Sequence, residues 1–83
     1  MKKIELKNKL VELCLKETDI KVKPNDNLKS AGIDSLALVS LIVAIEEAFE
    51  ISFDDSDLEP KNLNTLNDIL KIVEKYLWDY GII

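Results

Sequence analysis

The stretch GIDSLALVSLIVAIEEAF, residues 32–49, decides the fold of this chain. It opens on a glycine and an aspartate and continues as a long run in which apolar residues recur at helical spacing. Asp34 is placed to cap a helix, and its negative charge there meets the positive end of the helix dipole. The stretch therefore predicts a helix from Ser35 to about Phe49, preceded by a turn that Gly32 makes possible.

This predicted helix is apolar on two faces. The face that we assign to the core consists of Leu38, Leu41, Ile42, Ile45 and Phe49. Leu36, Val39 and Val43 fall on a different face. A chain of 83 residues can hardly surround one helix on all sides, so we expect the second face to bind a partner. Plain packing is the alternative for Val39 and Val43.

Residues 3–18 predict a first helix, because their apolar positions form one helical face. That face is made of Leu6, Leu10, Leu13 and Cys14. We interpret Cys14 as a small core residue, and a single cysteine without an internal disulfide suits a reducing compartment. A loop over residues 19–32 follows, with turn residues at positions 24–27. Three apolar side chains are expected to hold this loop against the helices: Ile20, Val22 and Leu28.

The last third of the chain predicts a short helix and a long one. Residues 51–53 are interpreted as a loop whose two large apolar side chains fill the core, and residues 59–63 fit one helical turn with Pro60 at its first position. Residues 65–68 form a capping-box pattern that opens the final helix, and Gly81 is a natural stop for it. The core face of this helix consists of Leu66, Ile69, Leu70, Val73 and Leu77.

These elements predict an all-α fold, a small four-helix bundle of three longer helices plus a short third helix. We expect one domain over residues 1–83, since the length leaves no room for a second core. The longest apolar stretch is about half the length needed to span a bilayer, and no apolar leader follows Met1. We therefore predict neither a membrane span nor a signal peptide. We also expect a monomer that works in the cytoplasm.

Residue types that are missing exclude most catalytic chemistry. The chain has no histidine and one cysteine, so no Ser-His-Asp or Cys-His nucleophile and no histidine or thiolate zinc site can be assembled. The acidic run at residues 54–59 lacks a calcium loop, because Pro60 and Leu66 stand where that loop needs glycine and glutamate. We predict that the protein is not an enzyme and holds no metal.

Charge is distributed unevenly along the sequence. Residues 1–29 carry eight lysines and five acids, residues 30–60 carry eight acids and no base, and the whole chain has a net charge of −5. A field of one sign repels nucleic acid and attracts basic partner surfaces. We therefore expect no nucleic acid among the partners. On charge alone, a solvated face without a partner is the alternative.

Ser35 stands in the most informative surroundings. By itself, a serine in a first helical turn indicates ordinary capping chemistry. Four segments around it form a wider pattern: Leu28…Gly32-Ile33-Asp34-Ser35-Leu36, Ala44-Ile45-Glu46-Glu47-Ala48-Phe49 with Ile51, Leu58-Glu59-Pro60-Lys61-Asn62-Leu63, and Thr65…Ile69. With this pattern, the chain from Leu28 to Ile72 resembles the carrier protein family, namely acyl carrier proteins and their peptidyl and D-alanyl relatives.

The resemblance implies a stand-alone carrier in which Ser35 holds covalent 4′-phosphopantetheine from coenzyme A. A phosphopantetheinyl transferase with its own magnesium would attach the group, which fits the absence of histidine here. The thiol of the arm would hold acyl or aminoacyl intermediates as thioesters for fatty acid, polyketide or related specialised biosynthesis. Loading and processing enzymes with basic docking surfaces would be the other partners. Asp34 would contribute to recognition by the transferase. The apolar part of the docking surface would be Leu36, Val39 and Val43, and Glu46 and Glu47 would attract basic partners.

Two positions depart from the pattern of bacterial fatty acid synthesis. Carriers of that class commonly have acids two and five residues after the modified serine, whereas this chain has Ala37 and Ser40. A dedicated carrier for polyketide, peptide or D-alanyl transfer is therefore at least as well supported. The alternative function is an unmodified helical interaction module that docks through its acidic second helix. Alanine at Ser35 would abolish the first function and spare the second.

Overall fold

The computed structural model describes residues 2–79 and 81, and these form helices and turns. The three long helices are α1 (Lys3–Thr18), α2 (Ser35–Phe49) and α3 (Leu66–Asp79). Between α2 and α3 lie two 3-10 turns, η1 (Asp55–Leu58) and η2 (Pro60–Asn62). The all-α prediction is confirmed, and α1 and α2 have the bounds that the sequence predicted.

The short third helix predicted over residues 59–63 is present as the 3-10 turn η2, and the 3-10 turn η1 before it was not predicted. Asp54 and Asp57 cap η1 reciprocally, since each side chain accepts a hydrogen bond from the backbone N–H of the other residue. Glu59 then has extended backbone angles, φ −67° and ψ 137°. A residue before proline is kept out of the helical region, and proline itself has no N–H to continue the ladder. Pro60 therefore divides the segment in two.

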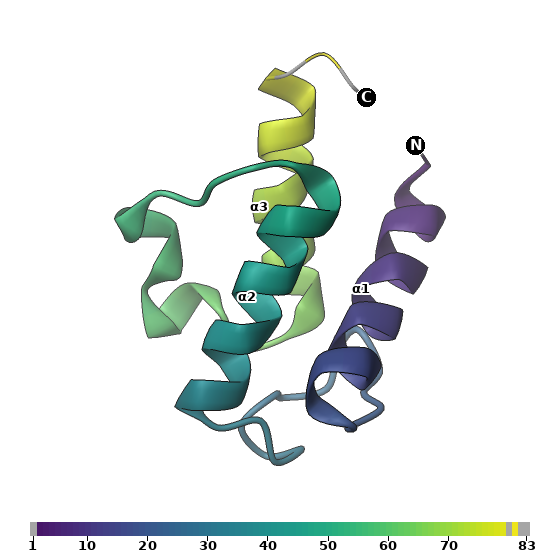
Figure 1. Ribbon diagram of the computed structural model, residues 1–83, viewed down its shortest axis with the longest axis vertical. Coiled ribbons are helices and arrows are strands. Elements are labelled where there is room, and N and C mark those ends of the chain that lie inside the picture. Colours follow the sequence, from purple (N-terminus) through teal and green to yellow (C-terminus); the bar gives the residue numbers. More distant parts are fainter. Residues whose placement is uncertain (1, 80, 82–83) are drawn as a thin grey trace.

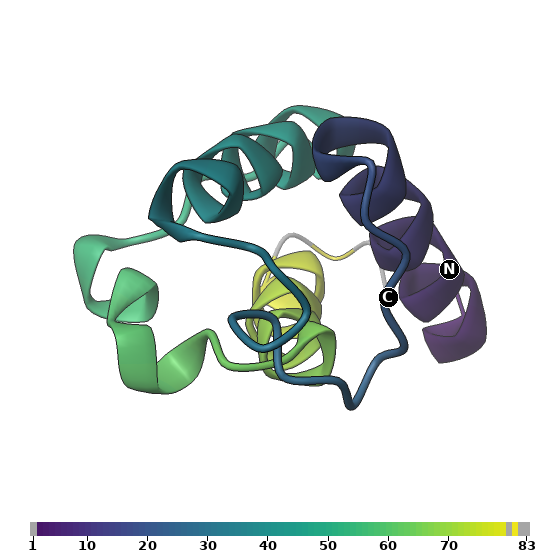
Figure 2. The same cartoon turned by 90° about the horizontal axis from the view of Figure 1, so that it is seen from below.

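Helix α1 packs against both α2 and α3. Figure 1 shows α1 at one side of the molecule and the segment with η1 and η2 at the other, with α2 between them. The view from below in Figure 2 agrees, and it shows the loop between α1 and α2 crossing beneath the helices. This arrangement leaves one face of α2 turned toward η1 and η2 rather than toward another long helix.

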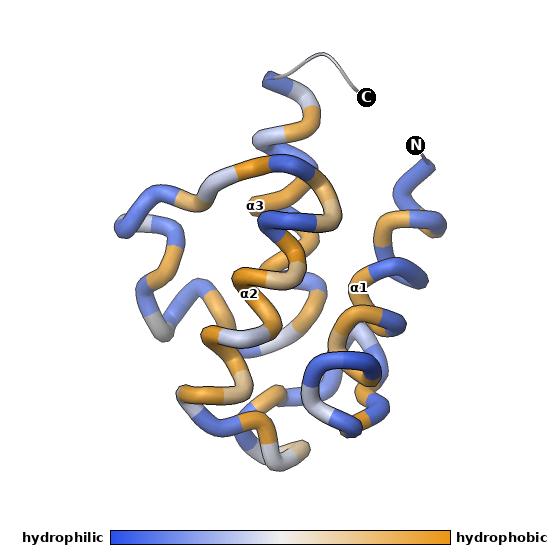
Figure 3. The backbone as a smooth tube through the Cα atoms, in the orientation of Figure 1, coloured by the Kyte–Doolittle hydropathy of each residue, from blue (hydrophilic) through white to orange (hydrophobic). Residues whose placement is uncertain are grey.

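The core is formed by apolar side chains from the three helices and from both long connections. The predicted core faces of α1 and α3 are buried throughout, as are Val22, Leu28, Ile51 and Phe53 from the loops, whereas Ile20 is partly buried. On α2 the predicted core face is buried except at Leu38, which is only partly covered. Helix α2 is the most apolar of the three (Figure 3), more so than its core contacts require.

Cys14 is fully buried among these side chains, which confirms its interpretation as a core residue. Burial raises the pKa of the Cys14 thiol, although its hydrogen bond with the Thr18 hydroxyl acts in the opposite direction. The thiolate is the reactive form of cysteine. Cys14 should therefore react slowly, because burial limits the access of reagents and the raised pKa keeps the thiol protonated.

No helix within residues 2–79 is long and apolar enough to cross a membrane.

Candidate functional site

A tight turn places Ser35 at the surface. The Leu28 N–H donates to the carbonyl of Asn64 at 2.8 Å, and the Ile33 N–H donates to the carbonyl of Leu28 at 2.9 Å. Leu28 and Ile33 are themselves buried. Gly32 has a φ of +105°, where any side chain would strain the backbone. The start of α2 is therefore fixed to the core on one side and open on the other.

Asp34 is the N-cap of α2, as the sequence predicted. Its Oδ1 accepts a hydrogen bond from the Ala37 N–H at 2.8 Å. Ser35 is the first residue of the helix and its side chain is exposed. The hydroxyl is thus held at a rigid helix start where a second protein can reach it.

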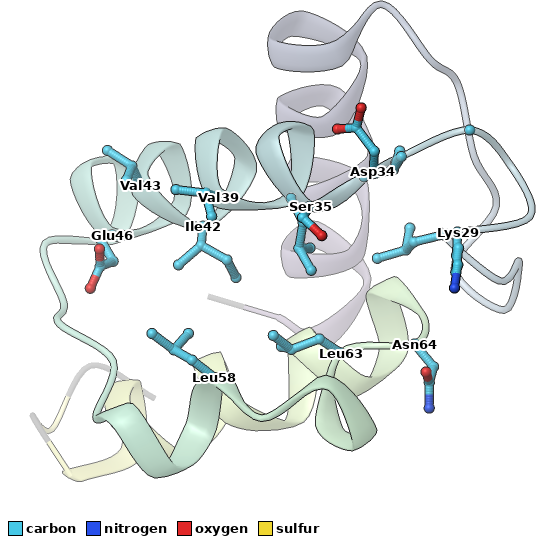
Figure 4. Close-up of a pocket in the computed structure, with 14 residues that line it drawn as sticks. Lys29, Asp34, Ser35, Val39, Ile42, Val43, Glu46, Leu58, Leu63 and Asn64 are labelled. Carbon is cyan, nitrogen blue, oxygen red and sulfur yellow. The ribbon is translucent and has the colours of Figure 1, made fainter.

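A groove with a volume of about 740 Å³ begins beside Ser35. One wall is α2, and the other contains Leu58 and Leu63 from the region of η1 and η2 (Figure 4). Most of the side chains that line it are apolar, and they include Leu38, Val39, Ile42 and Val43. Figure 4 shows Glu46 at one end, and Lys29 and Asn64 at the other. The groove brings together residues from 28 to 64, so no local pattern could have predicted it.

The second apolar face of α2 is exposed. Leu36 is 81% exposed, Val39 60% and Val43 45%. Glu47 lies one turn beyond Val43 and is also exposed. Packing within this chain therefore does not explain these apolar residues, and their role in binding a partner stays a prediction.

Glu46 has an internal contact that the sequence did not indicate. Its Oε2 accepts a hydrogen bond from the Phe53 N–H at 2.9 Å, and the side chain is partly buried. This contact holds the chain where it leaves α2 and turns toward η1. Among the predicted recognition residues, Glu46 therefore has a structural role as well, whereas Glu47 is free to face a partner.

Tyr76 of α3 ties η1 to the rest of the molecule. Its hydroxyl donates a hydrogen bond to Asp57 Oδ2 and accepts one from the Asp54 N–H at 3.1 Å. Its ring packs against Phe53 with centroids 5.9 Å apart. The hydrogen bond to Asp57 raises the pKa of Tyr76 to about 12. Because Leu58 of η1 lines the groove, this contact helps to fix one groove wall.

Within residues 2–79, no three side chains of the kinds His, Cys, Asp or Glu cluster closely enough to hold a metal ion. The site offers an accessible hydroxyl and an apolar groove, and the chain has no histidine to act as a base. This arrangement suits a residue that is modified by another protein.

Comparisons with known proteins agree with this interpretation. The family model described as "Phosphopantetheine attachment site" matches residues 8–73. An acyl carrier protein of Coprothermobacter proteolyticus is 31% identical over 74 residues, covering 89% of this chain and 88% of that protein. An acyl carrier protein homolog of Mycoplasma genitalium is 38% identical over 76 residues, covering 92% of this chain and 83% of that protein. An acyl carrier protein of Desulforapulum autotrophicum is 50% identical over 44 residues, covering 53% of this chain and 54% of that protein.

The family model spans most of the chain, and two relatives match it over most of their own length. Members of this family are carriers rather than catalysts, and their cofactor is covalently attached 4′-phosphopantetheine. The chain therefore belongs to the acyl carrier proteins, the family of the phosphopantetheine attachment site.

Proposed function

We propose that Ser35 is the residue that carries 4′-phosphopantetheine. The observation that supports this most directly is the exposed Ser35 hydroxyl at the rigid start of α2, beside an apolar groove. An accessible hydroxyl fits the covalent bond, and the adjoining groove fits an arm with an apolar load. Residues 1–83 would then act as one carrier domain.

The chemistry requires a second protein. The Ser35 oxygen forms a bond to the phosphorus on the pantetheine side of coenzyme A, the phosphoanhydride bond breaks, and adenosine 3′,5′-bisphosphate leaves. A base must take the hydroxyl proton, and the chain has no histidine for this step. The phosphopantetheinyl transferase would supply that base and the magnesium. The loaded arm then offers a thiol that forms thioesters.

We propose apolar acyl groups as the main cargo. The groove beside Ser35 is lined mostly by Leu, Ile and Val side chains, which suits a hydrocarbon chain better than an aminoacyl group. Ala37 and Ser40 stand where carriers of fatty acid synthesis commonly have acids. These positions support a dedicated carrier of a specialised pathway, such as polyketide synthesis, that works in the cytoplasm.

The partners would bind the exposed face of α2, made of Leu36, Val39, Val43 and Glu47. An apolar strip beside an acidic residue fits an apolar patch with basic residues around it. Asp34 would belong to the same surface at the start of the helix.

Intact mass after incubation with coenzyme A, magnesium and a broad-specificity phosphopantetheinyl transferase tests the attachment. We expect the wild type to gain one phosphopantetheine unit and Ser35→Ala to gain none. Ser40→Ala is the matched control, since Ser40 is an exposed serine of the same helix, and it should be modified like the wild type. A wild type that stays unmodified by a transferase active on another carrier would contradict the proposal.

A further inference from the structure

We propose that Lys29 is a positioning residue for the phosphopantetheine arm, because its ammonium group binds the phosphodiester next to Ser35 and draws the arm over the groove. The inference rests on the proposed attachment at Ser35. It assigns a role to a residue that the sequence pattern did not single out.

The turn before α2 fixes where Lys29 lies. Leu28 is buried and its N–H donates to the carbonyl of Asn64, so the neighbouring Lys29 is held beside Asn64 at one end of the groove. The Lys29 carbonyl accepts from the Gly32 N–H at 3.1 Å, which closes the turn that leads to Ser35. Lys29 and Ser35 line the same groove (Figure 4).

The charges around Ser35 make Lys29 the base that would pair with a phosphate on this serine. A phosphodiester on Ser35 would carry one negative charge beside the carboxylate of Asp34. Among the described residues that line the groove, Lys29 is the only base, and residues 30–60 of the sequence contain none. Lys29 is exposed, so its long side chain can reorient toward a phosphate without losing core contacts.

An ion pair at this point selects the direction of the arm. Lys29 lies with Asn64 at one end of the groove, and Ser35 belongs to the lining of the same groove. When the phosphate pairs with Lys29, the start of the arm is held at the groove rather than in the surrounding solvent, so the thiol end spends more time within the groove. Without that pair, no other base among the described residues of the groove lining holds the phosphate there, so the arm is free to extend into solvent.

Alkylation of the arm thiol by iodoacetamide, which is uncharged, measures this preference. The native apo protein should react little, because Cys14 is buried, so the rate in the holo protein reports the arm. We expect holo Lys29→Gln to be alkylated about two- to fivefold faster than the wild type at low salt, which is the range for an exposed ion pair. The difference should shrink as salt is added. Lys29→Arg keeps the charge and should behave like the wild type.

Lys21→Gln is the matched control, because it removes the same charge from an exposed lysine outside the groove lining. Equal rates for Lys29→Gln and the wild type, or equal acceleration by both glutamine variants, would overturn the inference. Intact mass is recorded for each protein first. A wild type that gains no phosphopantetheine overturns the proposed function and this inference together. Complete loading with no effect of Lys29 overturns this inference alone.

Discussion

Asp34 combines a structural contact and a negative charge at the first turn of α2, and substitutions can separate the two. Its carboxylate accepts from the Ala37 N–H at 2.8 Å. Asp34→Ala removes this cap, so we expect the free energy of unfolding to fall by about 1 kcal/mol. Asp34→Asn keeps an oxygen acceptor in the same place and should lose much less. Urea denaturation of the three proteins measures the difference.

The charge of Asp34 has its own measurement. If the carboxylate contributes to recognition by the transferase, Asp34→Asn should be loaded more slowly than the wild type although its stability is nearly kept. Equal loading rates would mean that Asp34 serves only as a cap. An unchanged stability for Asp34→Ala would contradict the capping role that the geometry gives it.

At the scale of the elements, η1 depends on one tyrosine of α3. Tyr76→Phe removes the hydroxyl that donates to Asp57 and accepts from the Asp54 N–H, but it keeps the ring beside Phe53. We expect a loss of about 1 kcal/mol in the free energy of unfolding. Amide hydrogen exchange should accelerate most within η1, because the rest of the molecule keeps its contacts. Uniform acceleration across all helices would contradict a local role.

The raised pKa of Tyr76 adds a pH signature to the same variant. The hydrogen bond to Asp57 raises the pKa from 10.0 to about 12, so the folded state holds this proton more tightly than the unfolded state. The stability from this contact is fully present below pH 10 and is lost as the pH rises toward 12. The difference in stability between wild type and Tyr76→Phe should therefore shrink over that range. Comparing the two proteins cancels the titration of other groups.

The elements differ in how well the sequence predicts them, and the reason is the range of the contacts that stabilise them. Helices α1 and α2 follow from caps and apolar spacing within their own residues, and the start of α3 follows from the capping box, where Asp68 accepts from the Thr65 N–H at 3.2 Å. Turn η1 was missed although its Asp54–Asp57 capping is local, and its second support, the contact with Tyr76, comes from nineteen residues away.

The features of the candidate site also differ in whether local sequence or the tertiary fold determines them. The cap at Asp34 and the position of Ser35 at the helix start could be predicted from the sequence, because the turn and the cap are contiguous. The groove could not, because Lys29, Leu58 and Leu63 meet α2 only through the tertiary fold. The internal hydrogen bond of Glu46 was missed for the same reason, since Phe53 reaches it by a turn after the helix ends.

At the scale of the whole molecule, the fold keeps α2 available to other proteins. Helices α1 and α3, together with the loops, bury the inner face of α2, and its outer apolar face stays exposed. Acidic residues concentrate in the same third of the chain, since residues 30–60 hold eight acids and no base. The net charge of the chain is only −5, so the position of a charge should matter more for docking than the total.

Two variants with the same net charge test that expectation. Glu47→Gln removes one charge next to the exposed face of α2, and Glu12→Gln removes one from the exposed surface of α1. We expect Glu47→Gln to slow association with the transferase by about twofold at low salt, because an exposed charge pair contributes about 0.5 kcal/mol. Glu12→Gln should leave the rate nearly unchanged. Stopped-flow association at low and high salt measures both rates, and the effect of Glu47 should fade as salt screens it. Equal slowing by the two variants would mean that net charge, rather than the face of α2, steers the partner.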